Sequence, residues 1–154
     1  MNQYHLYVAG PMTWVPQFNY PAFDAMAVAL RRAGFRVTPP SELDSAEDRA
    51  AALQSPDGDP ATYSGPNSWG DFLARDVKLL ADGGIDGIVV LPGWERSKGA
   101  RLETFVGRML CNVKVFTWDA TYEELRPVSM LRLANAWLGV TISFHRIHPF
   151  EEAA

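Results

Sequence analysis

Apolar positions along this chain follow two periods, one typical of strands and one typical of helices. Short apolar runs predict strands at residues 4–9, 35–38, 85–91 and 113–118. Between them, apolar residues spaced three or four positions apart predict helices at residues 21–33, 46–53, 69–80, 102–110 and 127–138. A last run, 140–145, alternates apolar and polar residues, which predicts a half-exposed edge strand.

The boundaries of these elements carry ordinary start and stop signals. Asn19 is a candidate cap for the first helix, Pro21 fits its first turn and Gly34 fits its end. Residues 54–68 are rich in Pro, Gly, Asp and Ser, which predicts a mobile loop. Strands and helices alternate throughout, so we expect one α/β domain, residues 1–154, with a parallel sheet covered on both faces.

Composition and charge argue against several classes of protein. The chain has 154 residues, 47% of them apolar, and a net charge of −4, so a broad electrostatic grip on a nucleic acid polymer is not expected. No apolar run approaches the roughly 20 residues of a membrane span, and no signal peptide is visible. The single cysteine, Cys111, excludes an intrachain disulfide and suits the cytoplasm. The three histidines form no metal-ligand pattern with it, so we expect no metal.

Two junctions between a strand and a loop carry the candidate chemistry. The first is His5–Met12 and the second is Ile88–Glu103; each begins as an apolar strand and breaks at Gly and Pro. Ligands of open α/β sheets bind outside the carboxyl ends of the strands. The second junction also leads into a helix start, where free backbone N–H groups favour an anion. Together the junctions predict a site for a sugar phosphate or a nucleotide.

Two carboxylates stand out near these junctions. Asp76 lies on a helix stripe that is otherwise apolar, and a buried carboxylate without a partner is costly. It either makes an ion pair, with Arg75 or Lys78, or faces a ligand and transfers a proton. Glu103 either compensates the dipole of its helix or acts as a nucleophile on a sugar anomeric carbon.

The remaining candidate residues each have a structural and a functional interpretation. Ser97 and Gly99 form a phosphate site or a plain helix cap. Gly10 allows close approach of a ligand or is a turn glycine, and the Tyr7 hydroxyl faces the site or the core. Three loop aromatics stack on a base or pack on the scaffold or another subunit: Trp14, Phe18 and Trp94.

Taken together, these segments resemble the nucleoside 2-deoxyribosyltransferase superfamily, and most closely its small phage and bacterial members. The resemblance rests on Tyr7–Met12, Phe18–Phe23, Asp76 and Leu91–Glu103. It implies that Glu103 is the nucleophile of a covalent glycosyl-enzyme intermediate, that Asp76 handles the leaving base and its proton, and that Tyr7 positions the reacting groups. It also implies that Ser97, with glycines, holds a 5′-phosphate. The stretch 119–154 does not match that superfamily's C-terminus.

The resulting expectation is a flavodoxin-like three-layer α/β sandwich with a five-stranded, mainly parallel sheet in the order 2-1-3-4-5. We expect it to cleave or transfer at the N-glycosidic bond of a (deoxy)nucleoside 5′-monophosphate, without a cofactor, and to self-associate in the cytoplasm of a bacterial or phage-infected cell. The expected ligand-binding residues are Gly10, Pro11, Met12, Trp94, Ser97 and Gly99. Alternatives are an NAD or cytokinin-type nucleotide glycohydrolase, although the Pro-Gly-Gly-x-Gly-Thr loop of the latter is absent, and a nucleotide-binding protein without turnover.

Overall fold

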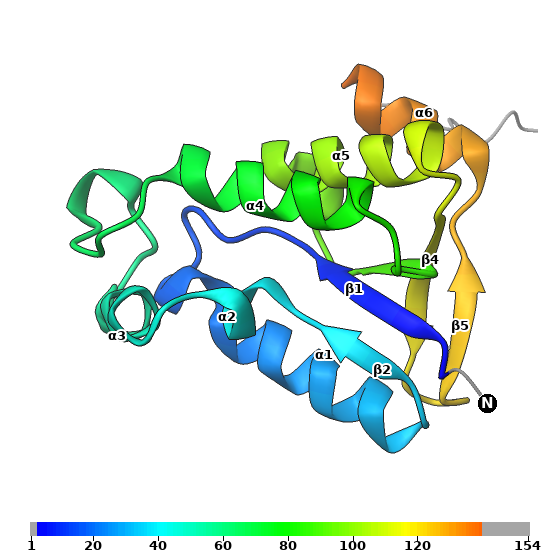
Figure 1. The fold of residues 1–154 in the computed structure, drawn as a ribbon, viewed down its shortest axis with the longest axis horizontal. Helices are drawn as coiled ribbons and strands as arrows, with labels where there is room; N and C mark the ends of the chain where they lie inside the picture. Colours follow the sequence, from blue (N-terminus) through cyan, green and yellow to red (C-terminus); the bar gives the residue numbers. More distant parts are fainter. Residues whose placement is uncertain (1–2, 140–154) are drawn as a thin grey trace, which may run out of the picture.

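The computed structural model describes residues 3–139, and five strands form one sheet in the order β2-β1-β3-β4-β5 (Figure 1). The strands are β1 (His5–Ala9), β2 (Arg36–Thr38), β3 (Gly87–Val90), β4 (Lys114–Asp119) and β5 (Glu124–Pro127). The first four are parallel, and the predicted fold class and strand order are therefore confirmed.

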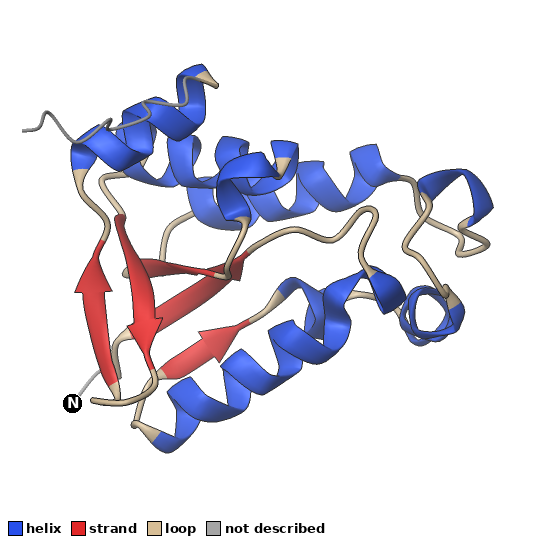
Figure 2. Ribbon diagram, turned by 180° about the vertical axis from the view of Figure 1, so that it is seen from behind, coloured by secondary structure: helices blue, strands red, loops and turns tan. Residues whose placement is uncertain are grey.

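Helices cover both faces of this sheet. They are α1 (Tyr20–Arg32), α2 (Pro40–Leu43), α3 (Ala46–Gln54), α4 (Trp69–Ala81), α5 (Lys98–Phe105) and α6 (Met130–Leu138). Short helical turns are η1 (Pro16–Asn19), η2 (Pro60–Thr62), η3 (Trp94–Arg96) and the π-helical η4 (Val106–Leu110). Figures 1 and 2 show α1 and α2 on one face of the sheet and α4 and α5 on the other, with α6 beside α5. This is the three-layer arrangement of a flavodoxin-like sandwich.

The fifth strand differs from the prediction. β5 pairs antiparallel with β4, from Phe116 opposite Pro127 to Asp119 opposite Glu124, and the two strands form a hairpin. At the turn, Asp119 Oδ1 accepts hydrogen bonds from the backbone N–H groups of Thr121 and Tyr122, at 2.9 and 3.2 Å. The predicted helix 127–138 accordingly starts later, at Met130. The predicted edge strand 140–145 lies outside the described residues.

Two apolar clusters fill the space between the sheet and its helices. Side chains of a strand alternate between the two faces, so Leu6 and Val8 pack under α1 while Tyr7 and Ala9 point toward α4 and α5. The first cluster also holds Phe23, Leu30 and Val89, and the second holds Leu80, Ile88 and Leu133. This alternation is what sends the Tyr7 hydroxyl to the α4–α5 side.

The first helix starts and ends close to the predicted positions. Asn19 occupies the cap position of α1 and Pro21 its first turn, but the Asn19 side chain donates to the Pro11 carbonyl at 2.8 Å instead of capping the helix. Gly34 follows α1 with φ of 94°, a left-handed conformation that glycine adopts without a side-chain clash.

The segment predicted as a mobile loop, residues 54–68, packs against α3 and the turn after β1. Asp48 of α3 is fully buried and accepts hydrogen bonds from the Tyr63 hydroxyl at 2.6 Å and from the Asn67 side chain at 2.5 Å. Burial raises the pKa of Asp48, but these bonds and that of Ser45 outweigh burial and leave it below its usual value. An ionised Asp48 thus holds this segment in place.

Across residues 3–139, no helix has both the length and the apolar composition needed to cross a membrane.

Candidate functional site

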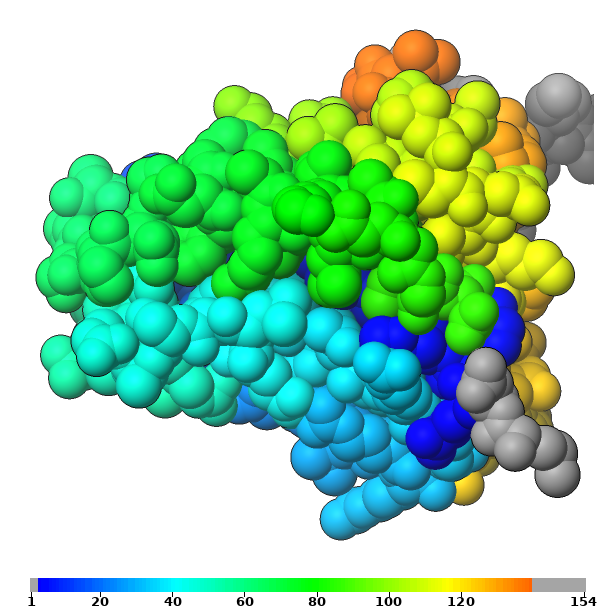
Figure 3. Space-filling view, in the orientation of Figure 1, coloured from blue at the N-terminus to red at the C-terminus, as the bar shows by residue number. Residues whose placement is uncertain are grey.

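A cavity of about 450 Å³ opens at the carboxyl ends of β1 and β3. Figure 3 shows the side chains of α4 and of residues 38–54 meeting over β1 on one face of the molecule. The cavity walls come from the turns after β1 and β3, from α4 and α5, from the segment 60–69, and from residues of α1 and α2 and Asp44. Its lining includes six of the predicted site residues: Gly10, Met12, Asp76, Ser97, Gly99 and Glu103. The cavity thus lies at the edge of the sheet where ligands of open α/β sheets bind.

Glu103 and Tyr7 meet at the inner end of the cavity. Glu103 projects from the second turn of α5 and is 6% exposed, and the Tyr7 hydroxyl donates to its Oε1 at 3.0 Å. Burial and nearby Asp76 raise the pKa of Glu103 to about 8, against a lowering by the Tyr7 hydroxyl and Arg75. Burial and the two carboxylates also raise the pKa of Tyr7 well above its usual range. Tyr7 is fully buried behind Glu103 and does not line the cavity, so it can act on a ligand only through its neighbours.

Asp76 makes the predicted ion pair and also faces the cavity. Arg75 Nε donates to Asp76 Oδ1 at 2.8 Å and Arg75 Nη2 forms an ion pair with the same oxygen at 2.8 Å, while Lys78 pairs with Asp82. Asp76 also lines the cavity and is 4% exposed, beside Glu103 and Tyr7. Burial raises its pKa, and Arg75 and the Tyr7 hydroxyl oppose that rise. An ion pair and a position in the cavity wall therefore coexist.

A second polar cluster, Arg75 with Asp44 and Tyr20, was not predicted as part of the site. Arg75 Nη1 and the Tyr20 hydroxyl both donate to the Asp44 carboxylate, whose side chain is 3% exposed. All three residues line the cavity. Asp44 comes directly after α2, and α2 begins at the Pro-Pro pair that follows β2. Asp44 therefore lies beyond the carboxyl end of a strand, as Gly10 does, and the rule that places ligands there applies to both residues.

The turn into α5 shows both the cap and the open space expected of an anion site. Ser97 caps α5, because its Oγ accepts the Ala100 N–H at 3.2 Å, and that Oγ lies 3.5 Å from the Gly10 carbonyl. A Cβ on Gly99 would meet only Ser97 Oγ, at 4.0 Å, and its φ is not left-handed. Neither packing nor backbone conformation therefore requires glycine at position 99, and the free space faces the cavity beside exposed Lys98.

At Gly10, in contrast, close packing requires a glycine. A Cβ there would lie 2.7 Å from Cβ of Leu91, so the contact between the turns after β1 and β3 excludes any larger residue. Gly10 still lines the cavity, beside Met12. Pro11 does not line it and instead accepts the Asn19 side chain through its carbonyl.

The three loop aromatics end in three different places. Trp94 belongs to the core cluster on the α4–α5 side, with 1% exposure, so a role in stacking on a ligand does not fit its position. Trp14 is 70% exposed and lies outside the cavity lining. Phe18 does line the cavity, where it contacts Tyr63 edge-to-face with ring centroids 5.4 Å apart.

Phe18, Tyr63 and Phe72 thus form an aromatic wall of the cavity. Tyr63 contacts Phe72 at a centroid distance of 6.1 Å, and Phe72 lies under the Arg75 guanidinium at 5.6 Å. In the sequence, Phe72 looks like part of the inner stripe of its helix. The structure divides that stripe: Leu80 packs in the core, while Trp69, Phe72 and Leu73 face the cavity.

Residues 4–116 match the family described as Domain of unknown function (DUF4406). The chain belongs to this family. The match runs from β1 into β4 and includes every residue that lines the cavity, so the candidate site is built from the DUF4406 domain itself. The hairpin strand β5 and α6 follow the matched region. A search of curated proteins found no match.

Within the described part of the DUF4406 chain, no group of three or more His, Cys, Asp or Glu residues is placed to hold a metal ion.

Proposed function

We propose that this DUF4406 protein cleaves, or transfers at, the N-glycosidic bond of a (deoxy)nucleoside 5′-monophosphate. The observation that carries the proposal is the pair of buried carboxyl groups, Glu103 and Asp76, facing one cavity beside a capped helix start. Such a pair suits chemistry at an anomeric carbon, where one group attacks and the other manages a proton. The resemblance to the nucleoside 2-deoxyribosyltransferase superfamily assigns the same residues to these roles.

In the proposed reaction, Glu103 in its ionised form attacks C1′ and the bond from C1′ to the base nitrogen breaks. Asp76 in its acid form delivers a proton to the departing base, which leaves neutral. The sugar is then bound to Glu103 as an ester. Water, or a second base, attacks C1′ in turn, gives its proton to Asp76, and releases Glu103 as a carboxylate.

Two groups of cavity residues suit the two ends of a nucleotide. Ser97, the open space at Gly99 and exposed Lys98 offer a hydroxyl, backbone N–H groups and a cation to a phosphate. The aromatic wall offers ring faces to a base. A cavity of about 450 Å³ lies within the usual range for small-molecule sites.

The test of this proposal is incubation of the protein with a panel of nucleoside and deoxynucleoside 5′-monophosphates, followed by chromatography for free base. Release of base from at least one of them, in proportion to protein concentration, supports the proposal. Tight binding with no released base would instead favour a nucleotide-binding protein without turnover.

Replacing Ser97 by alanine should weaken monophosphates far more than the matching nucleosides. A hydroxyl bonded to a charged phosphate contributes roughly 1.5–3 kcal/mol, which is about ten- to a hundredfold in affinity. Ser129→Ala is a matched control, because Ser129 caps α6 through the Arg132 N–H at 3.2 Å without lining the cavity. Both variants lose a helix cap, but only Ser97→Ala should lose a contact with phosphate. Calorimetric titration of both variants therefore distinguishes the two effects. Equal losses for nucleoside and monophosphate in Ser97→Ala would contradict the phosphate assignment.

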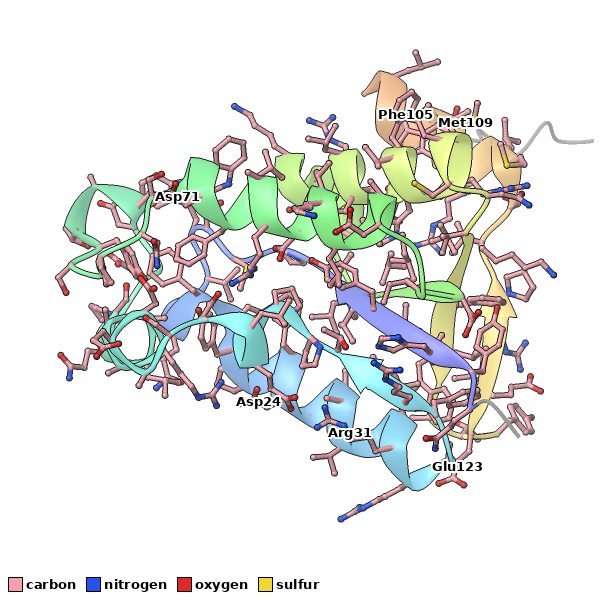
Figure 4. All side chains as sticks on the ribbon, in the orientation of Figure 1. Asp24, Arg31, Asp71, Phe105, Met109 and Glu123 are labelled. Atoms are coloured by element: carbon pink, nitrogen blue, oxygen red, sulfur yellow. The ribbon has the colours of Figure 1, made fainter. Side chains whose placement is uncertain are left out.

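We also propose that the chain self-associates in the cytoplasm. Of the loop aromatics that suggest this in the sequence, Phe18 faces the cavity and Trp94 is buried in the core. The support comes instead from exposed apolar side chains along α5, η4 and the end of α6: Leu102, Phe105, Met109, Leu110 and Leu138. Figure 4 shows Phe105 and Met109 together on the outer side of these helices. Apolar surface of this kind is typical of protein interfaces.

Light scattering at micromolar concentration should therefore give a mass of at least a dimer, and Met109→Lys with Leu110→Lys should reduce it to the monomer. A wild-type protein that is monomeric at this concentration, and still releases base at the same concentration, would contradict the self-association proposal.

A further inference from the structure

The corner formed by Tyr7, Asp76 and Glu103 holds more acidic groups than its surroundings can keep ionised. Glu103 is 6% exposed and Asp76 is 4% exposed. The groups that face them are Tyr7 from β1, Arg75 from α4, Asp44 after α2, Tyr20 from α1 and exposed Lys98 at the start of α5. Arg75 is the cation in contact, and it is shared between Asp44 and Asp76. Three ionised carboxylates would therefore face one guanidinium, so one of them is expected to hold a proton.

Contacts decide which carboxyl group holds that proton. Asp76 accepts a hydrogen bond from Arg75 Nε and pairs with Arg75 Nη2, each at 2.8 Å, and Asp44 accepts Arg75 and Tyr20, so ionised forms are favoured at both. Glu103 accepts a hydrogen bond from the Tyr7 hydroxyl at 3.0 Å, and Arg75 acts on it only through longer-range electrostatic attraction. The proton of the free protein therefore belongs on Glu103, the group that the proposed reaction needs in its ionised form.

We propose that Tyr7 relays one stored proton between the two carboxyl groups, and that Arg75 is the positioning residue that keeps this proton on Glu103 until a ligand binds. The proposal rests on the proposed function and deepens it. The Tyr7 hydroxyl bonds Glu103 at 3.0 Å and lies near enough to Asp76 for each of these two groups to shift the pKa of the other. It can therefore accept a proton from Glu103 while donating its own to Asp76.

The relay balances as a single concerted shift. Protonated Glu103 gives its proton to the Tyr7 oxygen as Tyr7 gives its own proton to Asp76, which leaves Glu103 ionised and Asp76 in its acid form. Tyr7 is neutral before and after, as its raised pKa requires. Asp76 then protonates the leaving base while Glu103 attacks C1′. The water that later frees the sugar returns a proton to Asp76, and the reverse shift restores the free protein.

The stored proton can be observed in the protein without any substrate. Carboxyl carbon NMR of the protein labelled in Glu and Asp, compared with Glu103→Gln, should assign one carboxyl signal that titrates in the range of pH 8. Arg75→Gln removes the cation that keeps Asp76 ionised, so the proton should pass in part to Asp76 and the Glu103 signal should move toward its ionised position at neutral pH, whereas Arg75→Lys should keep it near the wild-type position. Arg31→Gln, on a surface pair with Glu42, should not move it. A Glu103 already ionised at neutral pH would overturn the stored proton, and an unmoved signal in Arg75→Gln would overturn the role of Arg75.

Kinetics of Tyr7→Phe tests the relay itself. Release of an ordinary base should fall at least about 100-fold at every pH, because Asp76 no longer receives the proton. A substrate with an aryl leaving group that departs as a stable anion should regain its rate at alkaline pH, where Glu103 ionises to solvent. Tyr4→Phe is the matched control, since its hydroxyl bonds the Asp86 carbonyl at the far end of β1. Equal losses for both substrates across the pH range would overturn the relay.

These outcomes distinguish the relay from the proposed function. A wild-type protein that releases no base, but whose Glu103 holds a proton at neutral pH, contradicts the proposed function and supports the stored proton. Base release by a protein whose Glu103 is ionised at neutral pH supports the proposed function and overturns the stored proton.

Discussion

Glu103→Gln is expected to abolish base release from every nucleotide that the wild-type protein cleaves, with a loss of about 10⁴-fold or more. The amide is nearly isosteric with the carboxyl group and can still accept the Tyr7 hydroxyl, so the fold and ligand affinity should change little. It is a very poor nucleophile, however, and cannot form the sugar ester. Single-turnover chromatography for free base, with calorimetry for binding, measures the two effects separately.

Glu47→Gln provides the control for this substitution, because Glu47 is exposed in the first turn of α3 and lies outside the cavity lining. It should release base at the wild-type rate. A Glu103→Gln protein that keeps near-normal turnover would show that another group attacks C1′ and that the nucleophile assignment is wrong.

Asp76→Asn should lower the rate by about 10²–10⁴-fold for bases that leave poorly without a proton. The loss should be much smaller for leaving groups that depart as stable anions, because they need no acid. Asparagine can still accept from Arg75, so the contact that holds α4 at the cavity corner is preserved in part. Rates for a series of leaving groups of graded basicity measure this dependence directly.

Asp82→Asn is the control on the same helix, because Asp82 pairs with Lys78 on the surface. If Asp76→Asn damages all leaving groups equally, Asp76 positions the ligand and does not transfer a proton. Thermal unfolding of Asp76→Asn well below that of Asp82→Asn would show that the ion pair with Arg75 is chiefly structural.

Much of this site follows from local pattern alone. The two-residue period of β1 places Tyr7 and Leu6 on opposite faces of the sheet. Asp76 stands out in the sequence because it is an acidic residue on the apolar stripe of α4. Glu103 follows from its distance after the strand end at β3. In each case the side-chain direction depends on the residue's own element, so the sequence is sufficient to predict it.

Features that depend on contacts between distant segments were missed. Asp44 and Arg75 are 31 positions apart, and nothing local to either predicts that they pair. Side chains of loops are usually exposed, and Trp94 follows the loop after β3. The turn η3 nevertheless places its ring in the core beside α6. The strand β5 is polar and exposed, and its place beside β4 comes from the hairpin turn at Asp119, not from an apolar pattern.

The central claim is a covalent sugar ester on Glu103, and the most direct test is to trap it. Wild-type protein is mixed with a cleavable deoxynucleoside 5′-monophosphate, quenched in acid within a turnover, digested, and analysed by mass spectrometry. We predict that the peptide containing Glu103 gains the mass of the sugar phosphate, that fragmentation places this mass on Glu103, and that Glu103→Gln shows none. Base release with no modified peptide, or with the sugar on a different residue, would contradict the account.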